Sequence, residues 1–129
     1  MKIGDYMSSP VLSVDLETNV QEASKIMDSK KAGSLLITES GEYVGIITES
    51  DMTRKVLGGK LDPETTLVSQ IMSQPVLTLD RSMTIYEAND FMRDNKIRHL
   101  AVTEDEKIVG MLSIRDVVGF WRSVDTEGY

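Results

Sequence analysis

The sequence predicts an α+β fold made of two tandem β-α-β-β-α repeats packed sheet to sheet around a pseudo-two-fold axis. The chain repeats itself in register, and each copy shows the same order of strand-like and helix-like segments. Met7-Ser8-Ser9-Pro10 returns 65 positions later as Met72-Ser73-Gln74-Pro75, and the same ungapped offset superposes Asp51 on Asp116. One small copy cannot bury both faces of its own sheet, which favours packing against the other copy.

Each copy begins with a strand and a helix. Short apolar segments that follow a proline, at 11–14 and 76–79, predict the strand. Asn19 and Thr84 are N-cap residues with a Glu three positions later, which predicts that a helix starts at each. Apolar residues at i, i+3 and i+7 give these helices a buried face, made of Val20, Ala23 and Met27 in one copy and of Ile85, Ala88 and Met92 in the other.

A hairpin and a closing helix complete each copy. Apolar runs at 34–38 and 43–47, and again at 99–103 and 108–112, predict pairs of hairpin-linked strands. Closing helices are predicted at about 50–57 and 114–121. Gly58, Gly59 and Asp62-Pro63 break the pattern between the copies. We therefore divide the chain into a first repeat at 1–57, a linker at 58–66, a second repeat at 67–122 and a flexible tail at 123–129.

Composition excludes several classes of function. The chain has 129 residues, no cysteine and one histidine, so disulfides, thiolate metal sites and cysteine catalysis are excluded and a histidine-built metal centre is disfavoured. A formal charge of −7 disfavours nucleic acid as a partner. No apolar run is long enough to cross a bilayer and the N-terminus lacks the order of a signal peptide, which predicts a cytoplasmic protein without a membrane partner.

One motif occurs in both copies and carries groups suited to a ligand. It reads Gly45-Ile46-Ile47-Thr48-Glu49-Ser50-Asp51 in the first copy and Gly110-Met111-Leu112-Ser113-Ile114-Arg115-Asp116 in the second. A hydroxyl at a strand end and free N–H groups at a helix start suit a phosphate, and a carboxylate suits the two hydroxyls of a ribose. The alternative is that both motifs are simple helix N-caps, with Asp in place of Glu.

These motifs resemble those of the CBS domain family, whose pairs are also called Bateman modules, over most of the chain. The opening pattern of the family is seen as Asp5-Tyr6-Met7-Ser8-Ser9-Pro10-Val11 and, without the acid, as Gln70-Ile71-Met72-Ser73-Gln74-Pro75-Val76. The resemblance implies that Asp51 and Asp116 hold ribose hydroxyls, with Thr48 and Ser113 near phosphate. It also implies an adenine slot lined by Met7, Leu12, Ala32, Gly33 and Ser34, and by Met72, Leu77, Ile97, Arg98 and His99.

The two predicted sites are not identical. The second copy has Arg98-His99 where the first has Gly33-Ser34, and Arg98 resembles a phosphate-contacting residue of the family. Arg115 is a further candidate at the ligand, although it and Arg54 and Lys55 can equally be solvated helix charges. For His99, an ordinary partly buried side chain and a titrating switch are the two alternatives.

The resemblance implies a regulatory module rather than an enzyme. We expect it to bind AMP, ADP, ATP or S-adenosylmethionine in clefts between the two repeats, without a metal or other cofactor, and to signal to an unknown regulated protein. The family commonly forms dimers, so a homodimer is expected. The sequence offers no convincing nucleophile, metal cluster or phosphate-binding loop of an enzyme. The alternatives are a ligand-free structural or dimerisation module and, with less support, a nucleic-acid-binding protein.

Overall fold

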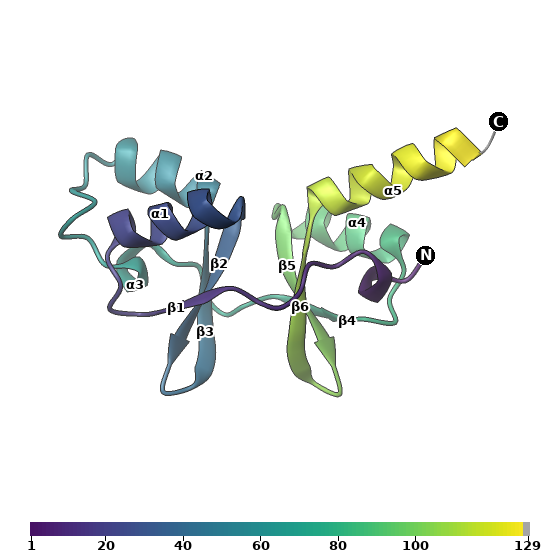
Figure 1. The fold of residues 1–129 in the computed structure, drawn as a ribbon, viewed down its shortest axis with the longest axis horizontal. Coiled ribbons are helices and arrows are strands. Elements are labelled where there is room, and N and C mark those ends of the chain that lie inside the picture. Colours follow the sequence, from purple (N-terminus) through teal and green to yellow (C-terminus); the bar gives the residue numbers. More distant parts are fainter. Residues whose placement is uncertain (128–129) are drawn as a thin grey trace. The chain divides into compact units, whose positions relative to one another are not determined.

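The computed structural model describes the backbone of residues 1–127 and the side chains of residues 1–123. The elements in chain order are η1 (Ile3–Asp5), β1 (Ser13–Asp15), α1 (Val20–Lys30), β2 (Ser34–Glu39), β3 (Glu42–Thr48), α2 (Glu49–Asp51), η2 (Met52–Leu57), α3 (Val68–Ile71), β4 (Thr78–Asp80), α4 (Ile85–Asn95), β5 (His99–Glu104), β6 (Lys107–Ser113) and α5 (Ile114–Glu127) (Figure 1). The predicted α+β fold and the order of elements in each repeat are confirmed.

Each repeat contains its own three-stranded mixed sheet, in the order β1-β2-β3 or β4-β5-β6. The first strand of each sheet runs parallel to the central one, and the last two form an antiparallel hairpin. Both hairpins turn through two residues with positive φ, Ser40 and Gly41 in the first and Asp105 and Glu106 in the second. Two successive turn residues with positive φ suit the right-handed twist of the paired strands. The turn therefore sets the pairing register of each hairpin, and the second strand of the hairpin leads into the motif.

The first helix of each repeat begins where the sequence predicts. The side chain of Asn19 accepts a hydrogen bond from the Glu22 N–H at 2.8 Å, and Thr84 forms a reciprocal pair with Glu87.

The closing helices differ from the prediction and from each other. In the first repeat three helical residues pass into a wider turn, in which the Gly58 N–H bonds to the Thr53 carbonyl five residues back. In the second, α5 reaches Glu127, beyond the predicted end near 121; residues 128–129 of the predicted flexible tail lie outside the described residues.

The chain divides into two compact units whose boundaries differ from those of the sequence repeats. The first-repeat unit is Leu12–Val76, and the second-repeat unit is Met1–Val11 together with Leu77–Tyr129. The N-terminal segment of the chain, which we call the N-terminal arm (Met1–Val11), therefore belongs with the second repeat. The Ile3 N–H bonds to the Met83 carbonyl at 2.8 Å, and Ser8 exchanges two backbone hydrogen bonds with Met111.

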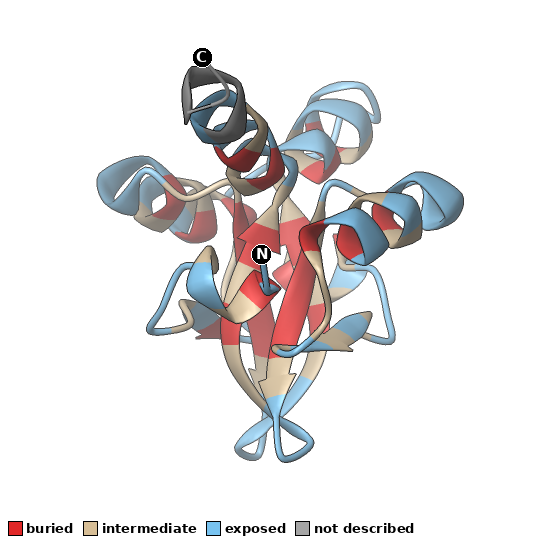
Figure 2. Ribbon diagram, turned by 90° about the vertical axis from the view of Figure 1, so that its right-hand side faces the viewer, coloured by how far each residue is buried: buried red, intermediate tan, exposed pale blue. Residues whose placement is uncertain are grey.

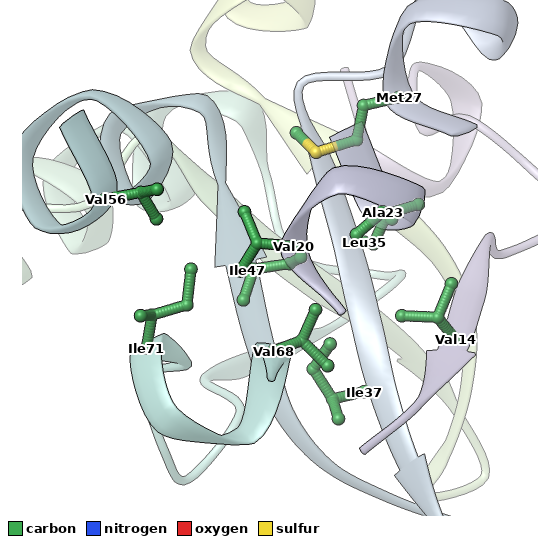
Figure 3. Close-up of a cluster of buried hydrophobic side chains, with 10 residues drawn as sticks. All are labelled: Val14, Val20, Ala23, Met27, Leu35, Ile37, Ile47, Val56, Val68 and Ile71. Carbon is green, nitrogen blue, oxygen red and sulfur yellow. The ribbon is translucent and has the colours of Figure 1, made fainter. Parts of the chain in front are cut away.

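The core of each unit lies between its sheet and its helices, as the red segments of Figure 2 show. In the first-repeat unit the core consists of Val14, Val20, Ala23, Met27, Leu35, Ile37, Ile47, Val56, Val68 and Ile71 (Figure 3). In the second-repeat unit it consists of Ile3, Ile85, Ala88, Met92, Leu100, Val102, Leu112, Val117 and Phe120. Val68 and Ile71 come from α3, and Ile3 comes from η1, so a short helical segment that precedes each opening motif helps to close a core.

Candidate functional site

The repeated motif of the first-repeat unit lies where β3 ends and α2 begins. The Asp51 side chain turns back and its Oδ2 accepts hydrogen bonds from the Thr48 N–H at 2.9 Å and the Thr48 hydroxyl at 3.2 Å. The Asp51 N–H in turn donates to the Thr48 Oγ1 at 3.3 Å, which completes a capping box. Asp51 is 9% exposed. Its carboxylate is therefore fixed by the local backbone.

In the motif of the second-repeat unit the carboxylate turns back in the same way. Asp116 Oδ2 accepts from the Ser113 N–H at 2.8 Å and from the Ser113 hydroxyl at 3.2 Å. Asp116 is half-buried, in the first turn of α5. The N-cap alternative raised by the sequence thus describes one role of both carboxylates. That role uses only Oδ2 of each carboxylate, so the partners of Oδ1 have to be considered separately.

The two motifs differ in what contacts the second carboxylate oxygen, Oδ1. Asp51 Oδ1 lies 3.0 Å from the Lys55 Nζ, and the same ammonium donates to the Ile71 carbonyl at 2.7 Å. Within the part of the chain that the structure describes, Asp116 Oδ1 has no such partner, because the residue in register with Lys55 is Phe120, which is buried in the core. The sequence left Lys55 equally as a solvated helix charge or as a residue lining a cleft, and did not pair it with Asp51. Its i,i+4 spacing from Asp51 was the signal that could have identified the pair.

The residues predicted to line the adenine slot just before the central strand do lie beside the motif of their own unit. The Gly33 carbonyl accepts from the Glu49 N–H at 3.0 Å, and Ser34 is the register partner of Thr48. In the other unit the Arg98 carbonyl accepts from the Ile114 N–H at 2.9 Å. His99 is the register partner of Ser113. These contacts hold each pre-strand segment against the helix start that follows the motif.

The two methionines of the opening motifs lie on the opposite repeat from the one in which they occur in sequence. Met7, from the N-terminal arm, lies over Gly110, and Met72 lies over Gly45: a Cβ on either glycine would come within 2.5 Å of the methionine Sδ. The predicted residues therefore separate into two sets. The first-repeat unit holds Leu12, Ala32, Gly33, Ser34, Thr48, Asp51 and Met72, and the second-repeat unit holds Met7, Leu77, Ile97, Arg98, His99, Ser113, Arg115 and Asp116.

The predicted apolar residues and cations are placed as follows. Leu12 and Met72 pack against the first core, and Met7 and Ile97 pack against the second. The Leu77 carbonyl accepts from the Ala101 N–H at the edge of the second sheet. Arg98 and Arg115 are exposed, and within the described residues neither forms an ion pair. His99 is half-buried.

The described residues contain no group of three or more His, Cys, Asp or Glu side chains arranged to hold a metal ion. Among the same residues, no helix combines the length and the hydropathy that a membrane span needs. What the two motifs offer chemically is a set of hydrogen-bond acceptors and donors at a strand-to-helix turn. In the second-repeat unit that set includes a carboxylate oxygen still able to accept from a ligand hydroxyl.

Comparison with known proteins agrees with the internal repeat. The family model of the CBS domain matches twice, at residues 3–58 and 68–122. An uncharacterized protein of Methanopyrus kandleri is 34% identical over 103 residues, which is 79% of this chain and 53% of that protein. The mitochondrial CBS domain-containing protein CBSX3 of Arabidopsis thaliana is 34% identical over 128 residues, which is 90% of this chain and 62% of that protein. The chain thus spans between about half and three fifths of the length of these relatives.

Solved structures show the same fold. An uncharacterized conserved protein from Pyrococcus horikoshii is 32% identical and superposes with a TM-score of 0.86, covering 94% of this chain and 92% of that one. A CBS-domain containing protein from Agrobacterium tumefaciens gives a TM-score of 0.86 at 26% identity, with 94% and 99% covered. A hexameric CBS-CP12 protein from bloom-forming cyanobacteria gives 0.85 at 25% identity, with 92% and 69% covered. Together with the repeat, the two motifs and the fold, these matches establish that the chain belongs to the CBS domain family and carries a pair of CBS domains.

Proposed function

We propose that this CBS pair is a non-catalytic regulatory module that binds an adenine nucleotide or a related adenosyl ligand, such as AMP, ADP, ATP or S-adenosylmethionine, and signals its presence to a partner protein. CBS pairs are in general regulatory ligand-binding modules. The observation that supports a ribose-bearing ligand is Oδ1 of Asp116, which has no partner among the side chains of residues 1–123, next to Oδ2, which already accepts from Ser113. A pre-organised acceptor binds a hydroxyl with little further loss of entropy.

The surroundings of Asp116 add charge of the sign that a phosphate needs. Arg98 and Arg115 are exposed cations, and the Arg98 backbone is bonded to the first residue of α5. The positive end of the helix dipole lies at the same place, since Ile114 is the N-terminal residue of this 14-residue helix. In this proposal Asp116 accepts from the ribose, Ser113 and Arg98 contact phosphate, and Met7, Leu77, Ile97 and His99 contact the base.

Signalling follows from linkage. A ligand that binds one conformation of the module more tightly than another shifts the population toward that conformation, and a partner that distinguishes the conformations reports the shift. The partner is a protein of unknown identity. The expectations that the sites open between the two repeats, that the module forms a homodimer and that it is cytoplasmic stay predictions.

A ligand-free structural module is the second candidate function. It is favoured by the hydrogen bonds that both signature carboxylates already accept at a helix start, without any ligand. Under this candidate the carboxylates would be maintained for stability alone. Nucleic-acid binding has no such support, and the formal charge of −7 opposes it.

The experiment that separates these candidates is calorimetry on Asp116→Asn, after a thermal-shift panel of AMP, ADP, ATP, NAD and S-adenosylmethionine has identified a ligand. Asparagine retains one carbonyl oxygen to accept from the Ser113 N–H but presents an amide in place of the free oxygen. We expect at least about tenfold weaker binding with an unchanged melting temperature of the free protein, because a hydrogen bond to a charged group is worth roughly 1.5–3 kcal/mol.

A matched variant separates the phosphate from the ribose. Arg98→Ala should weaken AMP more than adenosine, because adenosine has no phosphate for the guanidinium to contact. Equal losses for the two ligands would remove the phosphate role of Arg98. Unchanged affinity in Asp116→Asn, or a panel in which no compound raises the melting temperature, would instead favour the structural module.

A further inference from the structure

Lys55 occupies the place at Asp51 that a ligand hydroxyl would need. Its Nζ is 3.0 Å from Asp51 Oδ1 and 2.7 Å from the Ile71 carbonyl oxygen. With Oδ2 already bonded to Thr48, both oxygens of the Asp51 carboxylate are engaged by the protein itself. The side chain of Asp51 is 12% exposed, against 40% for that of Lys55, so the lysine is the more exposed partner of the pair.

Among the side chains that the structure describes, the second repeat has no equivalent of this contact. The register that superposes Asp51 on Asp116 places Phe120 opposite Lys55. Phe120 is 2% exposed and packs edge-on against Tyr6, at 5.3 Å between ring centroids. An aromatic ring committed to the core cannot reach across to a carboxylate. At this position, four residues beyond the motif, the two repeats therefore differ in whether a cation can reach the carboxylate.

The backbone of the first repeat supports this placement of Lys55. η2 (Met52–Leu57) is a wide turn rather than a regular helix, and the Gly58 N–H reaches the Thr53 carbonyl. Such turns inside helices are frequent at functional positions. Ile71, which supplies the second acceptor for Lys55, is 3% exposed and lies at the end of α3. Lys55 is thus held between two fixed acceptors rather than extended into solvent.

We propose that Lys55 is a built-in competitor that closes the Asp51 site to adenosyl ligands, so that the chain binds one such ligand, at Asp116. This inference rests on the proposed function for the identity of the ligand. A ribose diol entering at Asp51 must displace the ammonium from both of its acceptors, whereas at Asp116 it meets a free oxygen. A ligand at Asp51 therefore costs the two hydrogen bonds of the Lys55 ammonium. Because a hydrogen bond to a charged group is worth at least about tenfold in affinity, the Asp51 site should bind more weakly than the Asp116 site by at least that factor.

The test is isothermal calorimetry with AMP and S-adenosylmethionine on the full chain and on Lys55→Met. Methionine retains most of the aliphatic length of the lysine and removes the ammonium. We expect one ligand per chain in the native protein and two in Lys55→Met. Lys25→Met is the matched control, because Lys25 is exposed on α1 and forms no ion pair within the described residues. It should leave the stoichiometry at one.

A double variant makes the outcomes distinguishable. Lys55→Met with Asp116→Asn should bind one ligand, now at Asp51, while Asp116→Asn alone should bind none. Native stoichiometry of two, or a stoichiometry in Lys55→Met that stays at one, overturns the role of Lys55 and leaves the proposed function standing. Binding only when Lys55 is removed supports its role and rejects the Asp116 site. Absence of binding in all five proteins rejects both proposals.

Discussion

At the scale of single residues, the structure gives a physical reason for two features of the motifs that the sequence could only record. Each motif begins with a glycine, and each opening segment carries a methionine. Gly45 and Gly110 are buried and are in contact with Met72 and Met7, so a side chain on either glycine has no room. Each glycine and the methionine over it therefore form one packing contact, which positions the strand that ends at the motif hydroxyl.

The requirement for glycine at position 110 can be tested by adding one methyl group. A Cβ there would lie 2.5 Å from Met7 Sδ and 2.9 Å from the Ser8 carbonyl oxygen, and the second of these is backbone that cannot move aside. Gly110→Ala should lower the free energy of unfolding by about 1–3 kcal/mol, as overpacked cores do. Urea denaturation followed by circular dichroism measures it.

Gly119 provides the control for that variant within the same unit. A Cβ there meets no atom within 4 Å, and the residue lies inside α5. Gly119→Ala should therefore raise the stability by about 0.5–1 kcal/mol, which is the difference in helix propensity between the two residues. A loss of similar size in both variants would show that the packing against Met7 is not what selects glycine at 110.

At the scale of elements, the helix starts were the most predictable part of the chain. A capping residue and a Glu three positions later predicted both α1 and α4, and both begin at those residues. The closing helices were predicted less well, because their shape depends on tertiary contacts. The wide turn of η2 has no marker in its local sequence, and α3 is a single turn too short to show a period.

The contribution of a cap can be measured on α1. The side chain of Asn19 accepts from the Glu22 N–H at 2.8 Å, and Asn19→Ala leaves that donor without a partner in the helix. We expect a loss of about 1 kcal/mol in the free energy of unfolding, within the range for such caps. Ser29→Ala is the control on the same helix, since Ser29 is exposed near its C-terminal end, and it should change stability by at most about 0.5 kcal/mol. If the two variants proved equally stable, the bond to Glu22 would contribute nothing measurable.

At the scale of the whole molecule, the N-terminal arm belongs to the first repeat in sequence but packs with the second-repeat unit in the structure. The opening segments of the two copies are nearly alike, with Met7 matching Met72 and Ile3 in register with Val68. Either copy could accept either segment, so a single sequence contains no signal that decides between them. The structure decides it: the arm bonds to Met83 and Met111.

Deleting residues 1–11 from the full chain tests this assignment. Ile3 is 0% exposed in the second core, so its removal opens a cavity and also breaks the backbone bonds to Met83 and Met111. Amide hydrogen exchange should accelerate in β5 and β6, while β2 and β3 retain their protection. Faster exchange in β2 and β3 instead would assign the arm to the first repeat.

The candidate site was predicted only in part. Resemblance between the copies located both motifs, and each pre-strand segment does contact the motif of its own unit. The inequality of Asp51 and Asp116 did not emerge from the motifs, because both carboxylates obey the same pattern and the difference lies four residues beyond it, at Lys55 and Phe120. The identity of the ligand depends on the shape and charge of the whole binding site, which no single residue specifies.

Because the arm and α5 both belong to the second-repeat unit, the first and last described residues of the polypeptide lie in the same half of it. Tension applied to the two ends therefore acts on that half first. The first-repeat unit, Leu12–Val76, is inserted in the sequence of the other unit and bears tension only after that unit has unfolded. Any tethered domain, at either end, would be mechanically coupled to the half that contains Asp116.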